Sequence, residues 1–168
     1  MPQMDFLAKN HVVVGLYPVA DAFAGGVSSD IVSLSNYRKA TFFVFTGAIE
    51  DAGISNLVTV EACQDNAGTN HTAVAFKSRT ILSSTTVDVE GALTDRASTG
   101  YNFALANAVA NAVWVAEVVA EDIEAALPGY NWVRLTIAET VDKTITAMCL
   151  IVLSEPRYGL GGNVSAIA

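Results

Sequence analysis

The run Arg38-Lys39-Ala40-Thr41-Phe42-Phe43-Val44-Phe45-Thr46-Gly47 is the most strongly β-forming stretch of the chain. Aromatic and β-branched residues crowd it, and a glycine closes it. The side chains of a strand alternate between its two faces. One face of this strand is Ala40, Phe42 and Val44, and the other is Thr41, Phe43 and Phe45. Because both faces are apolar, the run predicts a central strand that is covered on both sides, by its own domain or by another subunit.

The composition of the chain also predicts subunit contacts. Its 168 residues are 52% hydrophobic and only 15% charged, whereas a typical soluble domain carries about 25% charged residues. So few charges cannot cover a surface in the usual way, and we expect some apolar area to be buried against other subunits. The length predicts one domain with a proper core, and no apolar run reaches the roughly 18 residues of a membrane span.

The charge of the chain argues against nucleic acid as a partner. Lys and Arg number 9 and Asp and Glu number 17, which gives a net charge of −8. Binding to a phosphate backbone needs clustered cations, and the cations here are scattered apart from Arg38 and Lys39. We therefore expect no nucleic acid as a partner, and interpret the acidity as that of a solvated surface. Because the apolar runs are too short to span a membrane, we also expect no membrane as a partner.

Runs with period-two alternation predict further strands around the central one. The predicted strands cover residues 12–16, 29–34, 38–47, 57–63, 72–79, 85–90, 112–120, 131–138 and 144–153. Residues 121–127 predict the one short helix, because acidic residues fill its first turn and Pro128-Gly129 ends it. With about eight strands and no β-α-β rhythm, the chain predicts an all-β fold, an antiparallel β-sandwich that could be a jelly roll.

The two ends of this single domain, residues 1–168, lack such periodicity. Residues 1–11 predict an N-terminal arm, and residues 155–168 predict a glycine-bearing C-terminal tail. The loop over residues 91–111 is long for a compact domain, so it could carry a contact. Aromatic and arginine side chains often anchor interfaces. The predicted interface residues are Phe43, Phe45, the outward-facing Trp132, and Arg157 and Tyr158 just past the last strand.

The familiar catalytic motifs are absent from the sequence. It contains no G-x-S-x-G, Walker loop, C-x-x-C or H-E-x-x-H pattern, and it has only two histidines. Cys63, Asp65 and His71 surround one predicted hairpin loop and could meet as a zinc site, but no fourth ligand is evident. We expect a polar hairpin tip there, and no catalytic residue, metal or cofactor in the protein.

Two other clusters allow a functional interpretation beside a structural one. The acidic cluster is Glu117, Glu121, Asp122 and Glu124. Paired carboxylates suit glycoside hydrolysis, but a strand end and a helix start explain these residues without catalysis. The aromatic cluster is Trp132, Tyr130, Trp114 and Tyr101. It could form a sugar-stacking platform, or it could place Trp114 in the core and Trp132 beneath the tail or a neighbour.

The two cysteines, Cys63 and Cys149, lie inside apolar strand patterns. Free cysteine packs as a small hydrophobic residue, so we expect two buried free thiols. The first residues, Met1-Pro2-Gln3-Met4-Asp5, have neither a basic start nor an apolar run, so no secretory signal is predicted. We therefore expect synthesis in a reducing cytoplasm.

Three stretches carry a family resemblance. They are Tyr37-Arg38-Lys39-Ala40-Thr41-Phe42, Val58-Thr59-Val60-Glu61-Ala62-Cys63 and Leu153-Ser154-Glu155-Pro156-Arg157-Tyr158-Gly159. In a small, acidic, cysteine-poor β-sandwich with non-periodic ends, they resemble the head decoration (cement, auxiliary capsid) proteins of tailed bacteriophages. The resemblance covers about half of the chain and assigns no functional residue.

The resemblance implies a structural virion protein rather than an enzyme. Such a protein would sit on the capsid exterior, form a trimer or another closed homo-oligomer, and bridge neighbouring major capsid proteins. Two alternatives remain open from the sequence. One is a carbohydrate-binding β-sandwich module, and the other is another virion part such as a head-tail connector or a tail protein.

Overall fold

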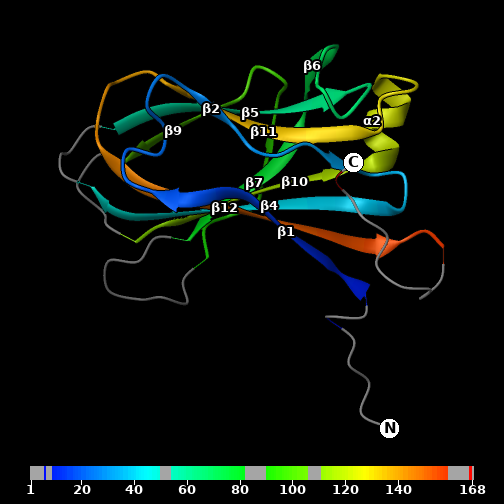
Figure 1. Cartoon of the computed structure of the whole chain (residues 1–168), viewed down its shortest axis with the longest axis horizontal. Coiled ribbons are helices and arrows are strands. Elements are labelled where there is room, and N and C mark those ends of the chain that lie inside the picture. The colour runs from blue at the N-terminus through cyan, green and yellow to red at the C-terminus, as the bar shows by residue number, and fades with distance from the viewer. Residues whose placement is uncertain are drawn as a thin grey trace, which may run out of the picture.

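The protein is a two-layered antiparallel β-sandwich in a computed structural model that describes residues 6, 9–49, 54–81, 90–105, 111–158 and 167 (Figure 1). Within these residues there are twelve strands, more than the eight or so predicted, because several short strands escape a search for alternation. The all-β class and the sandwich are confirmed. The helix α2 (Ala120–Ala126) lies at one end of the sandwich, close to the predicted 121–127.

The strands form two sheets. Sheet A has the order β1-β12-β4-β10-β7-β8, and sheet B has the order β2-β11-β5-β6, with β3 also pairing with β11 and β9 with β5. The strands of sheet A are β1 (His11–Val19), β4 (Tyr37–Ile49), β7 (Phe76–Ile81), β8 (Thr94–Arg96), β10 (Val113–Val119) and β12 (Ile145–Pro156). Those of sheet B are β2 (Val27–Ser28), β3 (Val32–Ser33), β5 (Ile54–Cys63), β6 (His71–Val74), β9 (Tyr101–Leu105) and β11 (Trp132–Glu139).

The strand order is that of a jelly roll. The short β2 and β3 pair with the same strand and count as one, and β7, β8 and β9 are an insertion between β6 and β10. The eight strands that remain, numbered along the chain, lie in the orders 1-8-3-6 and 2-7-4-5. This is the two-sheet arrangement with crossing connections that defines the jelly roll.

The core lies between the sheets and follows the predicted alternation. Strand β4 sits inside sheet A between β12 and β10, as its apolar run predicts. The inward residues Ala40, Phe42 and Val44 are buried, and so are Trp114 of β10 and Ile151 of β12. Pairing of Phe42 with Ala116 and Ile151 on its two sides fixes this face toward sheet B. Side chains at alternate positions therefore point away from the core.

The insertion corrects two predictions. Residues 72–79 are not one strand, because the chain leaves sheet B after β6, passes Ala75 and enters sheet A as β7. Alternation continues through this crossing, so the sequence pattern does not reveal it. The loop over 91–111 contains β8 and β9, which are joined through Gly100. Gly100 has φ +89°, and an added Cβ would lie 2.6 Å from the carbonyl oxygen of Val58.

Other element bounds differ more modestly from the prediction. The predicted strand 29–34 is replaced by the two short strands β2 and β3. The last strand reaches Pro156, which pairs with Tyr37, so the tail begins later than residue 155. The predicted strand 85–90 falls outside the described residues except for Glu90, which bridges to Ile81. Most of the predicted N-terminal arm and of the tail also lies outside them.

Candidate functional site

The outer face of sheet A is the most unusual surface of the described structure. Cross-strand pairs arrange its side chains in rows that run across the strands. One row is Val14, Leu150, Phe43 and Val115, and the next is Met148, Phe45, Val113 and Ile81. These side chains are half-buried by one another, and Phe45 is 38% exposed although it lies in a central strand. The sheet thus presents a continuous apolar surface that its own sandwich does not cover.

Charges border this apolar face and are paired among themselves. Near α2, Arg38 Nε lies 2.7 Å from Glu121, and Lys39 Nζ lies 2.8 Å from Glu155. The Glu121 carboxylate raises the pKa of Arg38, and the guanidinium in turn lowers the pKa of Glu121. Along the β7 side, further pairs join Lys77 to Asp95 and Arg79 to Glu90. Beside these four pairs, Glu117 of β10 lies on the same face, where it accepts a hydrogen bond from the Thr41 hydroxyl.

The outer face of sheet B has the opposite character. Glu61 and Arg134 are cross-strand partners with Nε and Oε2 2.7 Å apart, and the Thr136 hydroxyl donates to the same oxygen at 3.2 Å. Both charged side chains are more than four-fifths buried. The loop after β5 folds over them, so closely that a Cβ on Gly68 would lie 2.8 Å from the Arg134 guanidinium. Around the Glu61–Arg134 pair, this face is polar, hydrogen-bonded and covered by a loop of its own chain.

The cluster of Cys63, Asp65 and His71 does surround one hairpin loop, as the sequence predicts. The carboxylate of Asp65 accepts the backbone N–H groups of Ala67 and Thr69, at 3.1 and 3.3 Å. His71 Nδ1 lies 2.9 Å from the carbonyl oxygen of Gly68. Within the described part of the chain, no three His, Cys, Asp or Glu side chains are grouped as metal ligands. The polar groups of Asp65 and His71 thus form hydrogen bonds within the loop itself.

The aromatic cluster does not form an outward platform. Trp114 is buried, and the Tyr101 ring stacks on it with centroids 6.0 Å apart and planes 4° apart. The guanidinium of Arg96 lies 3.7 Å from the Tyr101 ring centroid and closes this stack. Trp132 is half-buried on the other sheet, opposite Cys63. Trp114 therefore belongs to the core, which is the structural interpretation that the sequence allowed.

The acidic cluster is divided between two elements. Glu117 lies on the outer face of β10, where the Thr41 hydroxyl donates to it at 3.3 Å. Glu121 and Asp122 occupy the first turn of α2, where the helix dipole favours carboxylates. Glu121 also forms an ion pair with Arg38. These contacts give Glu117, Glu121 and Asp122 structural roles, and Glu124 is exposed on α2.

The predicted interface residues fall on three separate surfaces. Phe43 and Phe45 lie together on the outer face of sheet A, with ring centroids 6.5 Å apart. Trp132 lies on sheet B, and Arg157 and Tyr158 follow β12 at the α2 end, where Tyr158 is 74% exposed. The sequence did not single out the neighbours that complete the apolar face, although the alternation in β10 and β12 placed them outward. They are Val14, Val113, Val115, Met148 and Leu150.

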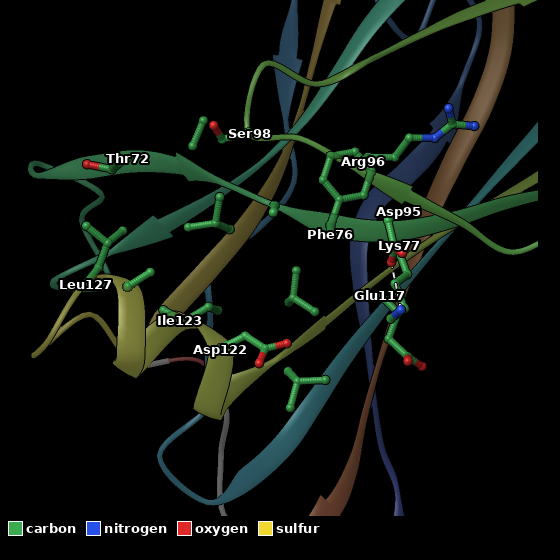
Figure 2. A pocket seen from close by; sticks show the side chains of 16 residues that line it. Thr72, Phe76, Lys77, Asp95, Arg96, Ser98, Glu117, Asp122, Ile123 and Leu127 are labelled. Atoms are coloured by element: carbon green, nitrogen blue, oxygen red, sulfur yellow. Dashed lines mark hydrogen bonds and ion pairs between the residues drawn. The ribbon is translucent and has the colours of Figure 1, made fainter.

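A cleft beside α2 was not predicted at all. It has a volume of about 570 Å³ and opens where the chain crosses from β6 to β7 (Figure 2). Its floor is the edge of the core, formed by Val74, Phe76, Val118, Ile123 and Leu127. Its lip carries the Lys77–Asp95 ion pair together with Glu117 and Asp122. Such a cleft depends on how two distant segments meet, so local sequence patterns do not signal it.

Both cysteines are free and buried, in agreement with the prediction. Cys63 ends β5 in sheet B, and Cys149 lies in β12 of sheet A. Burial raises the pKa of Cys149 to about 12, and burial also raises the pKa of Cys63. Because the thiolate is the reactive form, neither side chain is suited to nucleophilic chemistry in the folded protein.

Comparisons with known proteins return little. No family model and no curated protein matches the chain. The structure is similar to that of the SPBc2 prophage-derived protein YomS, with 13% identity, a TM-score of 0.41, and coverage of 85% of this chain and 92% of that one. It is also similar to a chain of the infectious bursal disease virus Gx strain, with 11% identity, a TM-score of 0.22, and coverage of 89% and 41%. Likenesses this distant carry no conclusion about function.

No helix among the described residues combines the length and the apolar character that a membrane crossing requires.

Proposed function

We propose that this chain is a structural protein of a tailed-phage virion, and specifically a head decoration (cement) protein that bridges major capsid proteins. One observation carries the proposal: two cross-strand rows of apolar side chains on the outer face of sheet A are not covered by any other described part of the chain. A patch of this kind on a folded domain marks a protein contact. The family resemblance of the sequence supplies the more specific role.

The size of the apolar face supports burial against a second copy of the same chain. Two rows of four outward residues, with strands about 4.8 Å apart and rows about 6.6 Å apart, give roughly 19 by 13 Å, or about 250 Å². A stable interface takes about 800 Å² from each partner. The apolar face would therefore form the centre of such an interface, and its charged border would form the rim. A closed homo-oligomer, such as a trimer or another ring, satisfies the face in every copy.

The net charge fits a place on the outside of a capsid. With a charge of −8, the protein has little attraction to packaged nucleic acid. The exposed Arg157 and Tyr158 at the α2 end are candidates for contacting the major capsid protein. The proposal includes no catalytic activity, cofactor or membrane, and it places synthesis in the host cytoplasm.

The test is made on virus particles. Particles purified from cells that produce this protein should contain it in a fixed ratio to the major capsid protein, as measured by quantitative mass spectrometry. Mild dissociation of the particles should release the protein from the heads while the tails stay intact. Recovery only in free tails, or at the head-tail joint, would instead assign it to a connector or tail. Absence from particles, combined with specific binding on a glycan array, would favour the carbohydrate-binding alternative.

A further inference from the structure

The cleft beside α2 separates the free edge of a strand from the helix. Strand β6 ends the order of sheet B, so one of its sides has no partner strand among the described residues. Helix α2 packs mainly against β4 and β10 of sheet A. Figure 2 shows Thr72 of β6 on one side of the cleft, with Ile123 of α2 and Leu127 on the other. The space between the strand edge and the helix is therefore open to a further element.

The free side of β6 can form hydrogen bonds with an added strand. In an antiparallel pair, only alternate residues direct their backbone N–H and C=O groups to the partner strand, and the others direct them outward. Thr72, Ala73 and Val74 pair with β5 on one side, and the same three residues line the cleft. An extended polypeptide in the cleft can thus lengthen the order of sheet B by one strand, as in β-strand addition.

The side chains that line the cleft are mostly apolar, and several of them are small. Those that water reaches are Ala73, Ala75, Val119, Ala126 and Leu127. Below them lie Phe76 and Ile123, which are buried at the edge of the core. The three alanines leave room above this floor, and a large apolar side chain of a bound segment would fill that room.

The lip of the cleft is acidic. Lys77 Nζ lies 2.7 Å from the Asp95 carboxylate, Glu117 lies beside this pair, and Asp122 extends toward it from α2 (Figure 2). The hydrogen bond to Asp95 raises the pKa of Lys77, and the charges of Asp122 and Glu117 raise it further. Three carboxylates thus face one ammonium group, so the lip favours a further basic side chain over an acidic one.

The second cation of the lining, Arg96, is engaged away from these carboxylates. Its guanidinium carbon lies 3.7 Å from the centroid of the Tyr101 ring, and its Nε donates to the Ser78 hydroxyl at 2.8 Å. In Figure 2 the guanidinium points away from α2 and Asp122. Arg96 therefore leaves the negative charge of the lip available to a ligand.

We infer that the cleft beside α2 binds an extended segment of a partner protein, which adds a strand to the free edge of β6. A large apolar side chain of the segment fills the space above Phe76 and Ile123, and a basic side chain reaches the lip. This inference goes beyond the proposed capsid role and does not require self-association through sheet A. Binding would also cover a strand edge that otherwise invites unspecific pairing.

A peptide library tests the chemistry of the segment. The probe is a mixture of acetylated and amidated hexapeptides, passed over the immobilised full-length protein, and the retained peptides are sequenced by mass spectrometry. We expect enrichment of sequences that combine an aromatic or large aliphatic residue with a lysine or arginine, and depletion of acidic sequences. Retention no greater than on a column without protein, or enrichment of acidic peptides, would overturn the inference.

Two pairs of variants show whether an enriched peptide occupies the cleft. Ala125 and Ala126 are both exposed on α2, but only Ala126 lines the cleft. We expect Ala126→Trp to weaken binding of a fluorescent peptide about tenfold, by filling its space, and Ala125→Trp to leave it unchanged. Asp122 and Glu124 form a second such pair. Asp122→Asn should weaken a lysine-bearing peptide roughly threefold and Glu124→Gln should not; equal effects within either pair would overturn the inference.

Hydrogen exchange tests the addition of a strand. With saturating peptide, we expect slower exchange of amides in β6, residues 72–74, because an added strand accepts hydrogen bonds from its free edge. The control is β2, which forms the opposite edge of sheet B and should exchange at an unchanged rate. Peptide binding without slower exchange in β6 would overturn strand addition. Slower exchange in β6 on raising the protein concentration without peptide would identify a second copy as the occupant and overturn the assignment to a partner protein.

Discussion

The two sheets of this sandwich turn different faces to the outside. The outer face of sheet B carries the Glu61–Arg134 pair and a threonine hydroxyl, and a loop of its own chain covers it. The outer face of sheet A carries Phe43, Phe45 and their apolar neighbours, and nothing in the described chain covers them. The side chains therefore give the two faces different surfaces: one is hydrogen-bonded within the single copy, and the other leaves apolar side chains in contact with water.

The two faces are expected to contribute differently to the stability of the single copy and to self-association. Removing the polar contacts of sheet B leaves a charge without its partner inside the protein, which costs stability. The outward phenylalanines of sheet A contribute less to the single copy, because water already reaches them. Their burial would contribute mainly when a second surface arrives. Substitutions on the outer face of sheet A should therefore change mainly self-association, whereas substitutions in the Glu61–Arg134 pair of sheet B should change the free energy of unfolding.

The largest expected effect is on self-association. Changing Phe43→Asp and Phe45→Asp together places two carboxylates at the centre of the apolar face. We expect association to weaken by roughly 100-fold, about 2.7 kcal/mol, since central aromatic residues dominate most interfaces. Sedimentation velocity over a range of concentrations measures this change. The control is Thr59→Asp, a half-buried outward position on β5 of sheet B; comparable weakening by the control would remove the distinction between the faces.

The next effect is on the stability of the single copy. Arg134→Leu leaves the Glu61 carboxylate, whose side chain is 15% exposed, without its cation. We expect the free energy of unfolding in urea to fall by about 2 kcal/mol. The comparison is Arg79→Leu, which breaks the pair with the 56% exposed Glu90 at the border of sheet A. An exposed pair contributes about 0.5 kcal/mol or less, so losses of equal size in the two variants would contradict this view.

A smaller effect concerns the buried thiols and depends on pH. The folded state holds the pKa of Cys149 at about 12, above the value of 9.0 for an unperturbed thiol. The unfolded chain therefore loses this proton at a lower pH, and the free energy of unfolding should fall as pH rises from 9 toward 12. Cys149→Ala should flatten this part of the pH profile.

Near neutral pH, both thiols should react with a thiol probe only after denaturation. An intact mass two hydrogens lower than that of the reduced chain would instead show a disulfide.

Removal of the tail should leave the fold almost unchanged. Strand β12 ends at Pro156, so a chain that stops at Tyr158 keeps both sheets. We expect deletion of residues 159–168 to shift the melting temperature by no more than about 2 °C, because the core side chains among the described residues lie before it. The same deletion should weaken assembly or capsid binding, if the tail crosses a neighbouring subunit. Unfolding of the shortened chain would show that the tail belongs to its own core.

The smallest expected effect is that of a chelator. The polar groups of Asp65 and His71 are occupied by the hairpin loop itself. Treatment with EDTA should therefore leave the melting temperature unchanged, whereas loss of a structural zinc would remove many kcal/mol. A decrease of several degrees that zinc reverses would identify Cys63, Asp65 and His71 as ligands.

The sequence predicts well those features that depend on alternation alone. It identified the central strand, both of its faces, the inward side of β10 and the short helix, because each follows from residues a few positions apart. Its expectation of apolar side chains on both faces of the central strand also agrees with the outward position of Phe43 and Phe45. Which outward residues line up across the sheet depends on strand order and register, and these are set by pairings such as Phe43 with Leu150, over 100 positions away.

The failures of prediction lie where the chain changes sheets. The alternation of residues 72–79 runs through Ala75 without a break, although β6 and β7 belong to different sheets. The same crossing opens the cleft beside α2. Strands β8 and β9 have only 3 and 5 residues, which is too short for a clear period. Long-range pairing with β7 and β5 holds these strands in place.

Hydroxyl-radical footprinting across a dilution series tests the central claim most directly. It reports, residue by residue, which side chains water can reach. The account predicts that Phe45 and Met148 are protected at high protein concentration and on particles, and become modified on dilution, while modification of Trp132 on sheet B stays constant. Equal modification of Phe45 and Met148 at every concentration, and on particles, would contradict the claim that the outer face of sheet A is buried in assembly.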